Sequence, residues 1–292
     1  MLLTLAGAAL VALVLREVFH TIFHPSGRGE LSMLVFRSVW ALTGKLGRRA
    51  RGLSGPLSMV LVIALWATGL VVGWALVYWP ALPGGFSFAA PLRAGAHGGL
   101  VDALYFSGVT QATLGFGDIT PRDGVLRLLA PLQATIGFAL FTAGVTWVLS
   151  VYPALQRQRA AASVARSIRE GNRGFDETTA GLPPAALVRQ TERLAELLAA
   201  VRVDLMQYPS IFYFAAPTVD VALSEALPYV ASLARQDGAA YELRPAAAEL
   251  ASALDLLLTG VGDQFLGMSD ADTADVLTAF RRHTGPLPGD GA

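Results

Sequence analysis

Cysteine is absent from this chain of 292 residues, which excludes disulfide bonds, thiolate nucleophiles and cysteine-ligated metal sites. Charged side chains are also scarce, at 15% of the residues, and the 22 basic and 22 acidic residues cancel. A balanced charge leaves no basic footprint for nucleic acid, so we expect no nucleic-acid partner. Hydrophobic residues reach 53% of the chain, and this excess over charged residues is typical of a membrane protein.

Several motifs that would assign a known chemistry are absent as well. No Gly-x-Gly-x-x-Gly follows a strand-like run, so a nucleotide-binding fold is not recognisable. No nucleophile is paired with a base, and no residues have the spacing of metal ligands, so we expect neither an enzyme nor a cofactor. No apolar run carries arginine at every third position, so a voltage-sensing helix is not expected.

Long apolar runs are the main positive feature of the sequence. Residues 57–79 carry no charge and end in aromatic side chains, which suit a membrane interface. Residues 125–152 form a second run of sufficient length, apart from Arg127. The first run reaches spanning length only if it continues through Arg16 and Glu17. We therefore predict an N-terminal helix over 1–24 that spans the membrane; the alternative is a helix lying partly in the interface.

The loop 25–56 is rich in basic residues, with six of them against the single acid Glu30. The positive-inside rule places such a loop in the cytoplasm. Apolar side chains recur at helical spacing over 31–46, which predicts an amphipathic helix on the membrane surface. The cluster Arg48, Arg49 and Arg51 would then either bind anionic lipid headgroups or act only as a topology signal.

A glycine-containing hexad, Thr113-Leu114-Gly115-Phe116-Gly117-Asp118, lies between the second and third long runs. The run before it, 100–112, is too short to cross a bilayer. Gly115 and Gly117 can adopt positive φ, so the backbone can alternate its handedness and turn successive carbonyls the same way. A row of such carbonyls can replace the hydration shell of an alkali cation. Non-helical backbone at this depth must be buried in protein or line water, which indicates a pore element.

The hexad resembles the selectivity filter of the potassium channels, which usually reads Thr-Val-Gly-Tyr-Gly-Asp. Leu114 and Phe116 replace the valine and the tyrosine, and Phe116 lacks the hydroxyl that could tie the filter to the pore helix. The pattern over 57–153 is similar to that of the bacterial channels built on two spans and a pore loop. The resemblance implies an outer helix over 57–79, a pore helix over 100–112, a filter over 113–118 and an inner helix over 125–152.

The resemblance also implies passive, selective conduction of K⁺ by a homotetramer in the bacterial cytoplasmic membrane. Each chain supplies one pore segment, so a central pathway requires several chains around an axis. The implied ion ligands are residues 113–117, namely Thr113, Leu114, Gly115, Phe116 and Gly117, with Asp118 at the outer mouth. Two alternatives remain open. One is a weakly selective cation channel, and the other is a membrane-anchored regulatory or sensor protein whose pore does not conduct.

The roles of three positions, one in the pore helix and two in the inner helix, are left open by the sequence. Val109 lies where some relatives have a glutamate that binds the filter aspartate, so Asp118 must find another partner or face water. Gly137 and Gly144, in the inner helix, are either gating hinges or small residues that allow close helix packing.

The last part of the chain, 154–292, is expected to be a cytoplasmic helical bundle. Within it, Leu187, Leu194 and Val201 repeat every seven residues, which suggests that this helix pairs with another. The aromatic run 211–214 is either a buried strand or a plug in the core. The predicted fold is thus an all-α membrane protein with a helical cytoplasmic domain.

Overall fold

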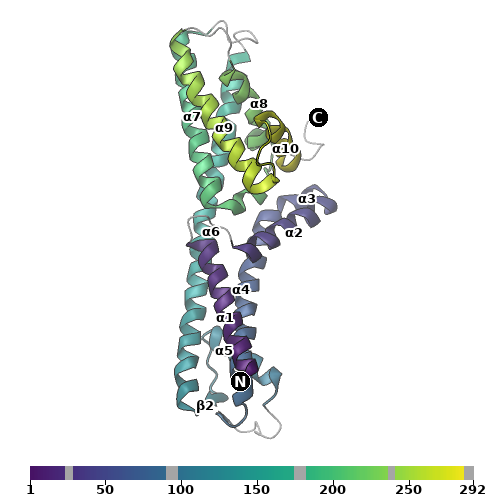
Figure 1. Cartoon of the computed structure of the whole chain (residues 1–292), viewed down its shortest axis with the longest axis vertical. Helices are drawn as coiled ribbons and strands as arrows, with labels where there is room; N and C mark the ends of the chain where they lie inside the picture. Colours follow the sequence, from purple (N-terminus) through teal and green to yellow (C-terminus); the bar gives the residue numbers. More distant parts are fainter. Residues whose placement is uncertain (24–28, 90–97, 174–181, 236–240, 286–292) are drawn as a thin grey trace. The chain divides into compact units, whose positions relative to one another are not determined.

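The computed structural model describes residues 1–23, 29–89, 98–173, 182–235 and 241–285. Helices dominate these ranges (Figure 1). Within them, three helices are long and apolar enough to cross a membrane: Leu2–Ile22, Ser54–Ala81 and Gly124–Asn172. The prediction of an all-α membrane protein is therefore confirmed. Contacts divide the chain into two units, one made of 1–35 and 58–149 and the other of 36–57 and 150–292.

The first unit contains the segments predicted to form the pore. In chain order its elements are α1 (Leu2–Ile22), the start of α2 (Glu30–Leu46), most of α4 (Ser54–Tyr78), η1 (Trp79–Ala81), β1 (Phe86–Phe88), α5 (Leu100–Gln111), β2 (Ile119–Pro121) and the first part of α6 (Gly124–Asn172). The two short strands form an antiparallel pair in which Ser87 lies opposite Thr120. This pair joins the segments before α5 and after the hexad.

Close packing of small residues holds α1 against α4 (Figure 1). A β-carbon at Gly7 would clash with the carbonyl oxygen of Gly73, and one at Gly69 would lie 2.8 Å from a methyl group of Val14. Gly69 and Gly73 are four residues apart, so they share one face of α4. Such small-residue faces let helices approach closely in a bilayer, where lipid supplies no hydrophobic drive for association.

A buried carboxylate on α1 caps the start of α2. Glu17, only 8% exposed, accepts hydrogen bonds from the backbone N–H of Ser32 at 2.8 Å and from its hydroxyl at 2.9 Å. The hydroxyls of Thr21 and Ser32 are also within hydrogen-bond distance, at 2.9 Å. The first N–H groups of a helix lack intrahelical acceptors, so an acceptor from another helix stabilises this end. Glu17 is thus a structural residue of the α1–α2 corner.

The second unit is a bundle of helices and short helical turns. Its elements are the rest of α2, α3 (Arg48–Gly52), the remainder of α6, α7 (Pro184–Gln207), η3 (Pro209–Tyr213), η4 (Val219–Val221), α8 (Leu223–Ala234), η5 (Tyr241–Leu243), α9 (Arg244–Val261), the π-helical turn η6 (Gly262–Leu266) and α10 (Thr273–Thr284). Helices α7 and α9 lie side by side (Figure 1). The heptad positions Leu187, Leu194 and Val201 are buried, so the repeat serves pairing within one chain.

Stacked rings fill the core of the second unit. Residues 211–213 belong to the helical turn η3, so the aromatic run is a core plug and not a strand. The ring of Phe212 stacks on Phe265 at 4.2 Å and on the imidazole of His283 at 5.1 Å between centroids. The ring of Trp40, on α2, also stacks on the imidazole of His283, with 5.3 Å between the centroids. The end of α2 is therefore part of this core.

Candidate functional site

The hexad lies between the C-terminal end of α5 and β2. Asp102 fixes the start of α5 by accepting from the backbone N–H groups of Gly98 and Gly99 at 2.8 and 3.1 Å. At the other end, the N–H of Thr113 donates to the carbonyl of Thr110, and that of Leu114 donates to the carbonyl of Val109. The hexad thus leaves the helix through two turn-like hydrogen bonds.

Backbone handedness alternates along the hexad. Thr113, Gly115 and Gly117 have φ angles of +57°, +56° and +78°. Positive φ was expected at the two glycines, but the sequence did not indicate it at Thr113, because a β-branched residue resists this region. Alternation at every second residue turns successive carbonyl groups to the same side of the chain. The backbone can therefore present a row of oxygen atoms, which is the chemistry that a dehydrated alkali cation requires.

Asp118 has a partner that the sequence analysis missed. The hydroxyl of Tyr105, on α5, donates to Oδ2 of Asp118 at 2.6 Å. The backbone carbonyl of Asp118 also accepts from the N–H of Ala89 at 2.8 Å. A tyrosine thus takes the bracing role for which Val109 has no polar atom. The available signal was an aromatic residue one turn of α5 before Val109, with a hydroxyl able to reach the hexad.

A buried polar network links α5 to the two flanking helices. Gln133 of α6 is fully buried, and its Nε2 donates to the carbonyl and the hydroxyl of Ser107 at 3.0 and 2.8 Å. The Ser107 hydroxyl in turn donates to the carbonyl of Val71 on α4 at 2.8 Å. These hydrogen bonds tie α5 to both α4 and α6, although the buried Oε1 of Gln133 has no hydrogen-bond partner among the described residues. The network thus holds the helix that leads into the hexad.

The two inner-helix glycines have different surroundings. A β-carbon at Gly137 would clash with the carbonyl oxygen of Gln111, the last residue of α5. At Gly144 the nearest atom to such a β-carbon is a methyl group of Ile63 at 3.5 Å, which is ordinary contact. Close packing thus accounts for glycine at 137 but not at 144.

Large apolar side chains around the hexad are not covered by their own chain. Leu114 is 59% exposed and Phe116 is 65% exposed, and Phe138 and Phe141 of α6 are exposed to a similar degree. Exposed apolar surface of this extent marks contact with lipid or with another protein chain.

In the basic cluster after α2, Arg51 has partners within the second unit. Its guanidinium carbon lies 3.7 Å from the ring centroid of Trp40, and its Nη2 donates to the backbone carbonyl of His283 at 2.9 Å. Part of the binding capacity of this arginine is therefore used within the fold. Arg49 is exposed, and the side chain of Arg48 lies outside the described residues.

Comparison with known families covers the same part of the chain. Residues 60–152 match the family model described as "Ion channel", a range that includes α5, the hexad and the apolar part of α6. Residues 60–152 are thus similar to an ion channel domain. The resemblance to channels with two spans and a pore loop is thereby confirmed for this channel domain.

Three relatives match parts of this chain. An uncharacterised membrane protein of Bacillus subtilis, YdjJ, is 28% identical over 151 residues, which are 51% of this chain and 43% of that protein. Protein LctB of Geobacillus stearothermophilus is 31% identical over 88 residues, 29% of this chain and 65% of that protein. Two-pore potassium channel 2 of Arabidopsis thaliana is 43% identical over 56 residues, 18% of this chain and 13% of that protein. The chain thus spans less than two thirds of each relative's length. No solved structure matches it significantly.

Proposed function

We propose that this protein is a potassium-selective channel that conducts K⁺ passively through a pore shared by four identical chains. The carbonyl oxygens of residues 113–117 would replace the hydration shell of the ion, and the Thr113 hydroxyl would add a ligand at the inner end. The observation that carries the proposal is the alternation of positive φ at Thr113, Gly115 and Gly117. The similarity to two-pore potassium channel 2 of Arabidopsis thaliana supports the choice of ion.

A homotetramer follows from the number of pore segments per chain. Each chain contributes one hexad to the lining of the pathway, and copies of the chain related by closed cyclic symmetry surround it. The exposed side chains of Leu114 and Phe116 would then be covered by neighbouring copies. The C-terminal end of each α5 would point its partial negative charge toward the pore axis, and four copies of Asp118 would attract cations at the outer mouth.

The proposed setting is the bacterial cytoplasmic membrane, with the second unit in the cytoplasm. The basic residues of 25–56 and the arginines that follow the apolar part of α6 favour this topology by the positive-inside rule. No chemical conversion is assigned to the chain, because ion conduction requires only the pore and an electrochemical gradient.

Ion flux into liposomes tests the proposal. Purified full-length protein is reconstituted, and rubidium uptake is compared with sodium uptake at equal ionic strength. We expect rubidium uptake to exceed sodium uptake at least about tenfold, which corresponds to about 1.4 kcal/mol of discrimination. Equal uptake of both ions would support the weakly selective channel, and no uptake of either by an assembled tetramer would support the non-conducting sensor.

A matched pair of glycine variants ties the flux to the hexad. Gly115→Ala places a β-carbon at φ +56°, whereas Gly84→Ala adds one in open space at an exposed position. We expect Gly115→Ala to lower rubidium uptake by about tenfold or more, because left-handed backbone costs a non-glycine residue about 1–2 kcal/mol. Gly84→Ala should conduct like the unmodified protein. Unchanged selectivity in assembled Gly115→Ala protein would contradict the proposed ion ligands.

A further inference from the structure

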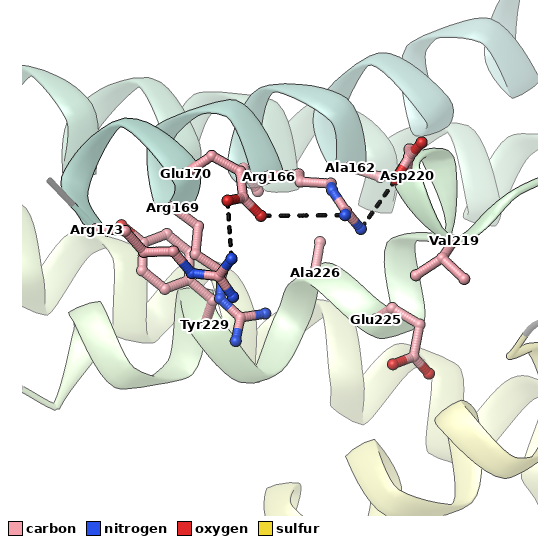
Figure 2. Close-up of a pocket in the computed structure, with 11 residues that line it drawn as sticks. Ala162, Arg166, Arg169, Glu170, Arg173, Val219, Asp220, Glu225, Ala226 and Tyr229 are labelled. Atoms are coloured by element: carbon pink, nitrogen blue, oxygen red, sulfur yellow. Dashed lines mark hydrogen bonds and ion pairs between the residues drawn. The ribbon is translucent and has the colours of Figure 1, made fainter. Parts of the chain in front are cut away.

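A cleft of about 160 Å³ opens in the second unit, between the last turns of α6 and the segment formed by η4 and α8. Figure 2 shows the side chains that line it. Part of the wall consists of Ala162 and Ala165 of α6 and Ala226 of α8. Because these side chains are small, the space between the two segments is left unfilled, while charged residues surround it.

Each carboxylate in the cleft already has a guanidinium partner. Glu170 pairs with Arg173 at 2.8 Å, and Asp220 pairs with Arg166 at 2.9 Å. Glu225 pairs with Arg281 of α10, also at 2.8 Å. The acidic side chains are thus neutralised by three arginines and leave no net negative charge for a cation.

Arg169 is the cleft arginine that forms no ion pair with any carboxylate among the described residues. Arg169, Arg173 and Tyr229 all line the cleft, and Figure 2 draws their side chains in the same part of it. Arg173, which directly follows α6, is paired with Glu170, so Arg169 leaves this group of ion pairs with one positive charge in excess. An anion bound here would balance that charge.

Tyr229 adds a hydrogen-bond donor to the same place. Its hydroxyl oxygen accepts from Nδ2 of Asn172 at 2.9 Å, and Asn172 is held in turn by Gln190 at 3.1 Å. The hydroxyl proton of Tyr229 is donated to no described residue, so it is available to an acceptor in the cleft. Two guanidinium groups and one hydroxyl thus converge from α6 and α8.

We propose that this cleft binds a small soluble anion bearing a phosphate group, with Arg169 and Arg173 as its principal ligands and Tyr229 as a further donor. Guanidinium groups match the geometry of phosphate oxygens and form paired, charge-assisted hydrogen bonds with them. Pockets for drug-sized ligands usually have volumes of about 300 Å³ or more, so the cleft suits inorganic phosphate or a small phosphorylated metabolite.

Titration of the full-length protein with inorganic phosphate tests the proposal. The protein is kept in detergent and in a phosphate-free and sulfate-free buffer, and binding is followed by calorimetry and by the melting temperature. We expect saturable binding below about 10 mM phosphate, with a rise in melting temperature. Sodium chloride at equal ionic strength should give neither effect. Absence of saturable phosphate binding would overturn the assignment.

Variants separate the cleft from other arginines of the second unit. Arg169→Gln should weaken phosphate binding at least about tenfold, while Arg189→Gln, on an exposed position of α7 outside the cleft, should bind like the unmodified protein. Should Arg169→Gln fail to fold, Tyr229→Phe provides the second variant, with weaker binding expected again. Equal affinity in the unmodified protein and a folded cleft variant would contradict the proposal.

A lipid arm distinguishes the source of the phosphate group. Vesicles that contain phosphatidic acid present the same monoester on a membrane surface. We expect these vesicles not to compete with free phosphate for the cleft. Binding to the vesicles without binding to free phosphate would overturn the assignment to a soluble anion. Because these measurements concern binding, they stand or fall independently of ion flux.

Discussion

The two units place their largest apolar side chains in opposite surroundings. In the first unit, Phe116, Phe138 and Phe141 are each about two-thirds exposed. In the second unit, Phe212 and Phe280 are 2% exposed and form part of a stacked aromatic core. The second unit therefore buries its core within one chain, whereas the first requires lipid or further copies of the chain to cover its surface.

This difference also concerns how the backbone is held. The second unit relies on continuous helices whose hydrogen bonds are internal. The first unit contains a non-helical hexad, and polar side chains from α5 and α6 secure its approach, notably Tyr105 and Gln133. Stability measurements on detergent-solubilised protein should thus report mainly on packing in the second unit, and assembly measurements mainly on the first.

The largest expected effect is a loss of core packing at Phe212. Phe212→Ala should lower the free energy of unfolding of the second unit by about 3–5 kcal/mol, because it removes a buried ring and leaves a cavity. The matched change Phe141→Ala removes an exposed ring from the first unit and should leave the free energy of unfolding of the second unit unchanged. Denaturant unfolding followed by circular dichroism measures both. Equal destabilisation by the two variants would break the comparison.

A smaller effect is expected where α6 passes α5. Gly137→Ala forces a β-carbon onto the carbonyl of Gln111, and overpacking of this kind costs about 1–3 kcal/mol. Gly144→Ala makes only ordinary contact with Ile63 and should change stability by less. Thermal melting and size-exclusion chromatography of the two variants provide the measurement. A gating role without a packing role at Gly137 would instead leave both variants equally stable.

The third prediction concerns the arginines after α2. Arg51→Gln should destabilise the second unit by about 1–2 kcal/mol, because it removes the contact with Trp40 and the hydrogen bond to His283. Arg49→Gln, at an exposed position, should have little effect on the melting temperature. If the two variants instead lost stability equally, and lost binding to anionic vesicles equally, Arg51 would be a lipid ligand after all.

The smallest effect should be a dependence of stability on pH. Burial lowers the pKa of His283, and the nearby charge of Arg51 lowers it further. The unfolded chain therefore binds a proton more readily, so the free energy of unfolding should fall as the pH drops below about 6.5 and be constant above it. Melting temperatures between pH 5 and 8 test this. His283→Phe should flatten the dependence, whereas His20→Gln, in the first unit, should preserve it.

Sequence reasoning reached the features that depend on local pattern. Bilayer thickness dictates the length and composition of spanning helices, so the apolar runs indicated them directly. The two glycines of the hexad and its position between apolar runs indicated a pore element. The sequence did not allow contacts between distant residues to be predicted. Tyr105 meets Asp118 across 13 positions, and Arg51 meets His283 across 232. The position of Tyr105 on α5 gave a signal for the first pair, whereas nothing in the sequence indicates the second, because the chain between Arg51 and His283 must fold first.

Single residues also have partners within the fold that the sequence does not indicate. For Arg51 the sequence leaves lipid binding and a topology signal open, and the structure places its guanidinium group on the ring of Trp40. Glu17 was treated as part of an apolar span, although it caps the start of α2. In both cases a charged side chain gains more from a specific partner within the fold than from the surroundings that its position suggests.

Threonine at position 113 holds a conformation that its own β-carbon disfavours. Isolated from its neighbours, this segment would relax to a more ordinary backbone, and its oxygens would turn in different directions. The geometry at the start of the hexad must therefore be imposed by surrounding contacts, by adjoining copies of the chain or by the ion itself. If the hexad binds cations as proposed, removal of these ions should loosen the segment, so that ion occupancy and backbone shape depend on one another.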